Sequence, residues 1–273
     1  MDAYDPIEPG SPRNYGMFMA LVVISQILGI ICVILTGAWL GAYWGGFSWT
    51  DSRVLFNYHP LFMVLGLVFL YGDAILVYRV FRNYRKLPIK VLHAVLHILA
   101  FLFAVVAVKA VFEFHDSRRI PNLYSLHSWI GLVALVLFGV QWVSGLITFL
   151  VPQMPQGPRA AYLPIHVSFG SGLFILIIGV CISGITEKNI FSQARSASSC
   201  IVPIVDCLAA KDSLKALCYF SNRYPSLETR EVLGNALGVC LVCFGAVIYY
   251  LITHPAYRRV ELVSPERRAL NQQ

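Results

Sequence analysis

Charged side chains are scarce in this chain of 273 residues. Only 13% of the residues are Asp, Glu, Lys or Arg, whereas 58% are hydrophobic and the mean hydropathy is +0.68. In soluble domains about a quarter of the residues are charged, so a soluble fold is disfavoured and an integral membrane protein is expected. The 14 acidic residues are outnumbered by 21 Lys and Arg, which gives a net charge of +7.

Paired CxxC motifs of a zinc site are also missing, although the chain has seven cysteines. The single CxxC, Cys240 with Cys243, lies in an apolar run, where we interpret both cysteines as small packing residues. Cys200, Cys207 and Cys218 share one loop, which permits one disulfide and one remaining thiol in an oxidising compartment. The first fifteen residues are polar and Pro-rich, so we expect a short tail and no cleavable signal peptide.

Long apolar runs are the most prominent feature of the sequence. Six of them can each cross a hydrocarbon core of about 30 Å, which takes roughly 20 helical residues. They cover Met17–Tyr43, Tyr58–Val80, Ile89–Phe112, Leu123–Val151, Tyr162–Ile185 and Val232–Thr253. Short polar links join the first five, which predicts an all-α integral membrane bundle over residues 16–254, with tails at 1–15 and 255–273. The alternating segments of a membrane β-barrel are absent from the sequence.

The positions of Lys and Arg predict the orientation in the membrane. If the N-terminus is cytoplasmic, most basic residues outside the long loop at 186–231 fall on the cytoplasmic side. Including that loop weakens the bias, but the rule applies best to short loops near the spans. We therefore expect both termini in the cytoplasm, and no nucleic-acid partner, since the basic residues are loop charges.

Four of the seven histidines occupy equivalent places near the starts of successive spans. They are His59, His93, His127 and His166. Because successive helices run in opposite directions, His59 and His127 lie towards the outer face, and His93 and His166 towards the cytoplasm. Intramembrane ionisable groups are costly and usually functional, and neutral imidazole is a common metal ligand. Two facing imidazoles can hold a haem iron, so the pattern predicts two haem sites at two depths.

Other interpretations stay open at this point. Each histidine alone can simply hydrogen-bond to a neighbouring helix or snorkel to headgroups, and the four together can line a metal or proton transporter without haem. His93 and His97 are spaced like zinc ligands, but no carboxylate joins them on that span, so His97 is interpreted either as a residue that supports a ligand or as a packing residue. A third hypothesis is a haem-binding anchor for a partner subunit, for which the short inner loops offer little docking surface.

Several stretches around these histidines resemble the cytochrome b561 family of ascorbate-dependent transmembrane electron carriers and ferric reductases. They read FNYHPLFMVLG, VLHAVLH, PNLYSLHSWIGL, LPIHVSFG and GITEK, and they cover about Phe56 to Lys188. The resemblance implies six transmembrane helices with a haem-binding core in helices two to five, two haem b per chain, and usually a homodimer. It pairs His59 with His127 and His93 with His166 as the axial ligands.

The resemblance also implies a function and further site residues. Electrons would pass from cytoplasmic ascorbate to ferric iron or monodehydroascorbate across a plasma, secretory-vesicle or lysosomal/endosomal membrane. Lys86, Lys90 and Arg159 would bind the ascorbate anion, and cations near His93 suit that role. On the outer face His115, in a loop beyond the third span, would contact the acceptor or move a proton. The resemblance places these further residues beside the haems or the acceptor: Arg79, Asn122, Leu123, Tyr124, Ser125 and Glu187.

Two features depart from the family pattern. Lys109 falls late in the third span, where we expect it to snorkel outward. The loop Thr186–Glu231 is longer than expected, and its segment CIVPIVDCLAAKDSLKALCYF is predicted to form an amphipathic helix over the outer face. Such a covering segment would reshape the acceptor site rather than the haem sites.

Overall fold

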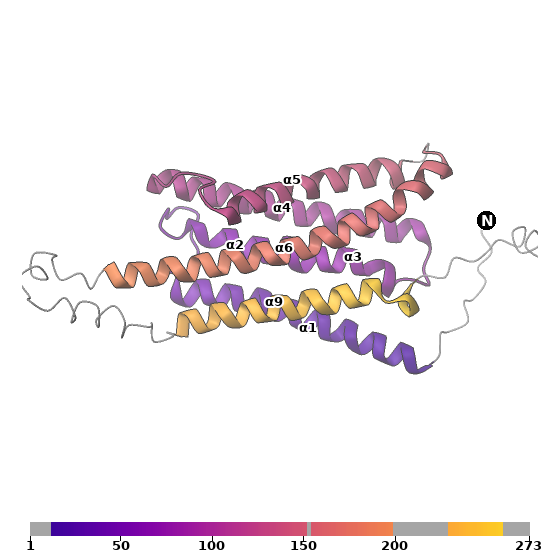
Figure 1. Cartoon of the computed structure of the whole chain (residues 1–273), viewed down its shortest axis with the longest axis horizontal. Helices are drawn as coiled ribbons and strands as arrows, with labels where there is room; N and C mark the ends of the chain where they lie inside the picture. Colours follow the sequence, from indigo (N-terminus) through magenta and orange to yellow (C-terminus); the bar gives the residue numbers. More distant parts are fainter. Residues whose placement is uncertain (1–11, 152–153, 199–228, 259–273) are drawn as a thin grey trace, which may run out of the picture.

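The computed structural model describes residues 12–151, 154–198 and 229–258, and all regular structure in these ranges is helical (Figure 1). The elements are α1 (Pro12–Tyr43), η1 (Leu55–Asn57), α2 (Tyr58–Met63), η2 (Val64–Leu70), α3 (Tyr71–Val80), α4 (Lys86–Arg118), α5 (Leu126–Gly145), η3 (Leu146–Leu150), α6 (Gln156–Ser198), α9 (Thr229–Thr253) and η4 (Pro255–Tyr257). Within the described residues, six helical stretches are long and apolar enough to cross a membrane. The predicted all-α, six-helix fold is confirmed.

Hydrophobic side chains cover the outside of the bundle as well as its inside. On α4, for example, Leu92, Leu99 and Leu102 are all exposed. A helix in lipid must satisfy its backbone hydrogen bonds internally and can present apolar side chains to the acyl chains. The buried core includes large side chains such as Trp39 and Phe244, which pack where α1 and α9 meet the rest of the bundle.

The helices are arranged so that α1 and α9 lie side by side at one edge, while α4 and α5 lie at the opposite edge (Figure 1). The second span, α2 to α3, and α6 lie between these edges. The start of α1 and the end of α9 lie at the same end of the bundle, as an even number of crossings requires. The predicted histidines therefore all belong to the helices away from the α1–α9 edge.

The second span is continuous but not uniformly α-helical, because η2 is a π-helix of seven residues between α2 and α3. A π-helical segment changes the angular relation between the residues on either side of it, and such segments are frequent at functional sites. Here His59 precedes η2 and Ala74 follows it, and both positions face α4, as described below. A second π-helix, η3, ends the α5 span.

Several helix boundaries differ from the sequence expectation, and three of them bear on the site. Helix α4 continues to Arg118 and ends where Arg119 adopts a left-handed φ of 56°, so His115 lies in the helix and the expected loop position is wrong. Helix α6 continues to Ser198, so the long loop does not begin at Thr186. Helix α5 begins at Leu126, after a Ser125–Ser128 capping box. Apolar runs report only the hydrocarbon crossing, so α4 and α6 continue past their runs, whereas α5 begins inside its run because the capping box fixes its start. The predicted amphipathic helix and Cys200, Cys207 and Cys218 lie outside the described residues.

Candidate functional site

The outer pair of predicted ligands, His59 on α2 and His127 on α5, face one another with ring centroids 6.1 Å apart. Backbone carbonyls hold the Nδ1 atom of each ring. His59 Nδ1 lies 3.3 Å from the carbonyl oxygen of Ala107 on α4, and His127 Nδ1 lies 3.0 Å from that of Val180 on α6. A carbonyl oxygen only accepts, so each Nδ1 carries the proton and each Nε2 keeps its lone pair for a metal.

The inner pair, His93 on α4 and His166 on α6, repeats this arrangement at the other end of the bundle. The ring centroids are 6.3 Å apart, and His93 Nδ1 lies 2.7 Å from the carbonyl oxygen of Ala74 on α3. His166 Nδ1 is buried without a hydrogen-bond partner among the described residues. Phe149 and Tyr162 flank the His166 ring at centroid distances of 5.2 and 5.9 Å.

Both pairs have the spacing and the donor set that a haem iron requires. An imidazole nitrogen binds a metal at about 2 Å, so two axial imidazoles on one iron have ring centroids roughly 6 Å apart. Among the described residues, no group of three or more His, Cys, Asp or Glu could hold a metal ion. Bare metal sites usually take three or four protein ligands, whereas a haem iron needs only its axial ligands from the protein. The residues present therefore fit haem b.

Two glycines give the imidazoles room, and sequence reasoning missed them. A Cβ added at Gly184 on α6 would lie 2.7 Å from Cε1 of His127, and one added at Gly145 on α5 would lie 2.8 Å from Cε1 of His166. Each helix thus carries one histidine and the glycine that faces the histidine of the other helix. The available signal was the dipeptide Ser-Gly at 144–145 and 183–184, but the same dipeptide at 171–172 faces no histidine, since a Cβ added at Gly172 meets nothing within 4 Å.

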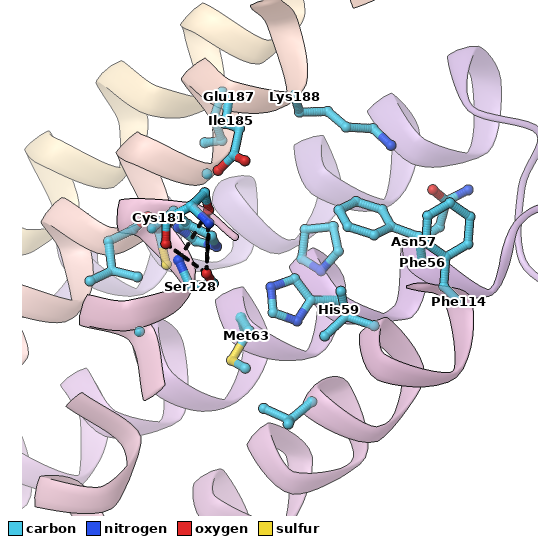
Figure 2. A pocket seen from close by; sticks show the side chains of 18 of the residues that line it. Phe56, Asn57, His59, Met63, Phe114, Ser128, Cys181, Ile185, Glu187 and Lys188 are labelled. Carbon is cyan, nitrogen blue, oxygen red and sulfur yellow. Dashed lines mark hydrogen bonds between the residues drawn. The ribbon is translucent and has the colours of Figure 1, made fainter. Parts of the chain in front are cut away.

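A cavity of about 490 Å³ surrounds the outer pair (Figure 2). Its volume is in the usual range of small-molecule and cofactor pockets. Five residues predicted to lie on this face border it, together with His59 and His127: His115, Leu123, Tyr124, Ser125 and Glu187. Leu123 has a left-handed φ of 56°, which is unusual for a side chain with a Cβ.

His115 is buried at the end of α4, and its contacts connect α4 to the segment before α5 in the cavity wall. Its Nδ1 lies 3.1 Å from Oδ1 of Asn122, whose amide donates to Asp116 at 2.9 Å. The His115 ring also lies 5.8 Å from the ring of Tyr124. Burial, with the negative charge of Glu187 adding to it, raises the pKa of Tyr124 to about 12. Tyr124 therefore stays a neutral hydrogen-bond donor at physiological pH.

Two of the predicted ascorbate-site cations converge on the carbonyl end of the α5 span, next to His166. Lys90 Nζ donates to the carbonyl of Phe149 at 3.1 Å, and Arg159 Nη2 donates to that of Val151 at 3.0 Å. Lys86 is exposed at the start of α4 and interacts electrostatically with Lys90. Arg79 instead donates to the carbonyl of Ile252, at the end of α9.

Two further residues singled out in the sequence have clear places. His97 is buried, with its ring 4.4 Å from that of His93 and 4.9 Å from that of Tyr71, which is the packing position expected. Lys109 is exposed on α4 and forms an ion pair with Glu113, one helical turn further along.

Comparison with known proteins identifies relatives over most of the chain. The family described as eukaryotic cytochrome b561 matches residues 58–192. The transmembrane ascorbate-dependent reductase CYB561 of Sus scrofa is 43% identical over 238 residues, which is 87% of this chain and 83% of that protein. The lysosomal membrane ascorbate-dependent ferrireductase CYB561A3 of Homo sapiens is 37% identical over 248 residues, 90% of this chain and 93% of that protein.

Proposed function

Because the chain belongs to the eukaryotic cytochrome b561 family, we propose that it transfers electrons across a membrane, from cytoplasmic ascorbate to an acceptor on the opposite side. The acceptor is ferric iron or monodehydroascorbate. Its relatives are named as ascorbate-dependent reductases, one of them as a ferrireductase. The observation that carries the proposal is the presence of two histidine pairs, at ring distances of 6.1 and 6.3 Å, near opposite ends of one helical bundle.

The two pairs are proposed to be the axial ligands of two haem b groups per chain. When bound, haem b supplies a one-electron carrier at each end of the bundle. His59 with His127 and His93 with His166 would supply the Nε2 ligands, and the carbonyls of Ala107, Val180 and Ala74 would fix three of the four rings. With a histidine on each side, the haem iron would have no free coordination position. The residues around each site would then control how closely the electron donor and the acceptor approach the haem.

The cations at the inner end are proposed to bind ascorbate. Ascorbate is an anion at neutral pH, and Lys90 and Arg159 bring two cationic groups to the carbonyl end of the α5 span beside His166. Lys86 adds a third positive charge from the exposed start of α4. Charge-assisted hydrogen bonds from these groups would hold and orient the donor. Both termini are then cytoplasmic.

The outer cavity is proposed to receive the acceptor. His115 and Tyr124 line it together, and His115 is placed to accept or donate the proton that accompanies the electron. Ser125 and Glu187 border the same space. The membrane is proposed to be a plasma, secretory-vesicle or lysosomal membrane, and the assembly a homodimer.

The test is a visible absorption spectrum of detergent-purified protein, titrated with ascorbate, with haem quantified per chain. Two bis-histidine haems per chain, both reduced by ascorbate, are the expected result. His127→Ala should lose the outer haem and keep an inner haem that ascorbate still reduces, whereas His166→Ala should lose the inner haem. A colourless protein would overturn the proposal in favour of a histidine-lined metal or proton path, and two haems persisting in His127→Ala would overturn the pairing.

A further inference from the structure

Lys188 on α6 has an unusual environment for a lysine, because its ammonium group lies between two aromatic rings. Nζ is 4.0 Å from the ring centroid of Trp44 and 4.1 Å from that of Phe56. Both distances are well within the range of cation–π attraction, which is stronger where water is excluded. The side chain is half-buried. Trp44 directly follows α1 and Phe56 belongs to η1, so the lysine joins α6 to two segments that are distant from it in the sequence.

The two rings are fixed independently of the lysine. Asn57, which is buried, donates its side-chain amide to the carbonyls of Trp44 at 2.9 Å and Gly46 at 2.7 Å. The Trp44 ring also packs edge-on against Trp39 at 6.0 Å. The Phe56 ring packs against Phe114 on α4 at 5.4 Å. The site for the ammonium group is therefore part of the fold, and the cation has a defined position.

This position is beside the outer histidine pair. The Phe56 ring that contacts Lys188 Nζ is itself 5.9 Å from the ring of His59, and Lys188 lines the same cavity as His59 and His127. Figure 2 shows the lysine amine extending towards Phe56, while the carboxylate of the adjacent Glu187 points to a different part of the cavity. One aromatic ring separates the positive charge from a predicted axial ligand.

Two other cations near the Trp44 and Phe56 rings form ion pairs with acidic residues. Arg230 also lies over Trp44, at 5.4 Å, but its guanidinium forms a 2.9 Å ion pair with Glu231. Arg53, which lines the cavity, is paired with Asp51. The ammonium of Lys188 instead lies against the Phe56 ring, which itself packs beside His59.

We propose that Lys188 holds a positive charge at a fixed position beside the outer haem, and that this charge raises the reduction potential of the outer haem relative to that of the inner haem. This inference rests on the proposed function, in which His59 and His127 hold that haem. Reduction adds one negative charge to the site, so a nearby cation stabilises the reduced state, and it does so more strongly in a poorly solvated interior. The effect favours electron flow from the inner end to the outer end.

The experiment is a redox titration of the purified holoprotein, with the two haem signals assigned beforehand from His127→Ala and His166→Ala. Lys188→Met should lower the reduced-to-oxidised ratio of the outer haem about tenfold at a fixed potential, which is about 59 mV for one electron. The inner haem should not change. Lys188→Arg keeps the positive charge and should retain the wild-type potential of the outer haem. If Lys188 only packed between the two rings, its charge would not matter and this agreement would not be expected. Lys109→Met removes a lysine from the exposed face of α4 and should move neither potential.

An unchanged outer potential in Lys188→Met, with both haem signals present, would overturn the proposal. So would an equal shift of both haems, since that indicates a general disturbance of the bundle. If Lys188→Met loses haem, the same comparison is made with Lys188→Gln, which keeps a polar side chain without the charge. Failure of the proposed function has a different signature, because the wild-type protein itself would then lack the two haem spectra.

Discussion

At the scale of single residues, the outer and inner sites depend on what faces each histidine as much as on the histidine itself. His127 is held by the carbonyl of Val180, and Ser183 Oγ lies 3.2 Å from its Nδ1. Gly184 leaves the space that the ring occupies, since an added Cβ would lie 2.7 Å from the ring's Cε1. A contact that short forces the ring or the helix to move. Here both the imidazole ring and the helix backbone are held by hydrogen bonds, so either movement breaks an existing contact.

Gly184→Ala is therefore expected to displace His127 and to cost the outer haem. The measurement is haem content per chain, with the spectrum separating the two sites through the His127→Ala reference. Gly179→Ala is the matched control, because the same change on the same helix meets nothing within 4 Å of the new Cβ. If Gly184→Ala retains both haems with wild-type spectra, the close approach of Gly184 to His127 is not needed for haem binding.

The four histidines could be predicted from sequence because their signal is periodic: one polar residue recurs at the start of each core span. His115 could not be placed correctly, because apolarity falls before α4 ends and the helix continues to Arg118. The role of Lys188 was not predictable, since its partners Trp44 and Phe56 are distant in the sequence and only the fold brings them together. Family membership, in contrast, was carried by short motifs, and the comparisons confirm it.

At the scale of elements, the π-helices place functional groups that regular helices would place elsewhere. The segment η3 ends the α5 span, and the carbonyls of Phe149 and Val151 at its end accept bonds from Lys90 and Arg159. The carbonyl end of a helix is the favourable place for cations. The same end lies against His166 through the Phe149 ring. The element therefore gathers positive charge at the predicted donor site.

Lys90→Met is expected to raise the KM for ascorbate about tenfold, in keeping with the loss of one charge-assisted hydrogen bond to the donor. Haem content should stay unchanged, because Lys90 does not hold either histidine. Steady-state reduction of the haems over a range of ascorbate concentrations measures this effect. Arg85→Met is the control, since Arg85 is an exposed cation at the same end of the bundle. An equal rise in KM in both variants would indicate general surface charge instead of a defined site.

The elements themselves were the most predictable feature, because a membrane span needs a long apolar run and the sequence has six. The π-helical character of Val64–Leu70 left no such signal, since an apolar run of this kind is equally typical of a regular α-helical span. The end of α6 was also missed, because residues beyond Ile185 become polar while the backbone stays helical to Ser198. Hydropathy predicts where a chain crosses lipid, and it does not predict where a helix ends.

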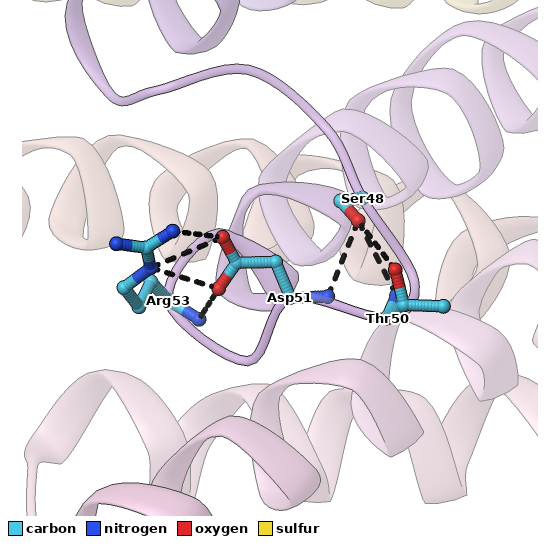
Figure 3. A network of polar contacts seen from close by, with 4 residues as sticks. All are labelled: Ser48, Thr50, Asp51 and Arg53. Carbon is cyan, nitrogen blue, oxygen red and sulfur yellow. Dashed lines mark hydrogen bonds and ion pairs between the residues drawn. The ribbon is translucent and has the colours of Figure 1, made fainter.

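At the scale of the whole molecule, the two ends of the bundle, which we propose to be the donor end and the acceptor end, differ in how their cations are paired. The inner end presents Lys86, Lys90 and Arg159. At the outer end, the cavity-lining Arg53 is engaged by Asp51, whose carboxylate accepts bonds of 2.7 to 3.1 Å from the guanidinium (Figure 3). Ser48 also accepts a bond from the Asp51 backbone N–H, which shapes the turn. At the proposed acceptor end, Arg53 is thus a cation whose charge is offset by Asp51.

That offset should persist in an acidic compartment. The hydrogen bonds from Arg53 lower the pKa of Asp51 to about 2. A carboxylate with a lowered pKa in the folded state contributes stability above its ordinary pKa and loses it as the pH falls through the lowered value. The Asp51–Arg53 pair is therefore unchanged between pH 5 and pH 7. Tyr124, with its pKa raised to about 12, does not change charge in this range either.

Asp51→Asn is expected to leave Arg53 with its full charge and so to favour anionic acceptors. In sealed vesicles that contain ascorbate, the KM for external hexacyanoferrate(III) should fall a few-fold, the KM for external hexaammineruthenium(III) should rise, and both changes should be the same at pH 5 and pH 7. Glu113→Gln is the control, because Glu113 is also paired with a cation but does not line the cavity. Equal changes for both acceptors would mean that the substitution alters the loop and not its charge. A change present at pH 7 and absent at pH 5 would mean that Asp51 is already protonated in the weakly acidic range, and the ion pair would then be a pH-dependent control of the acceptor site.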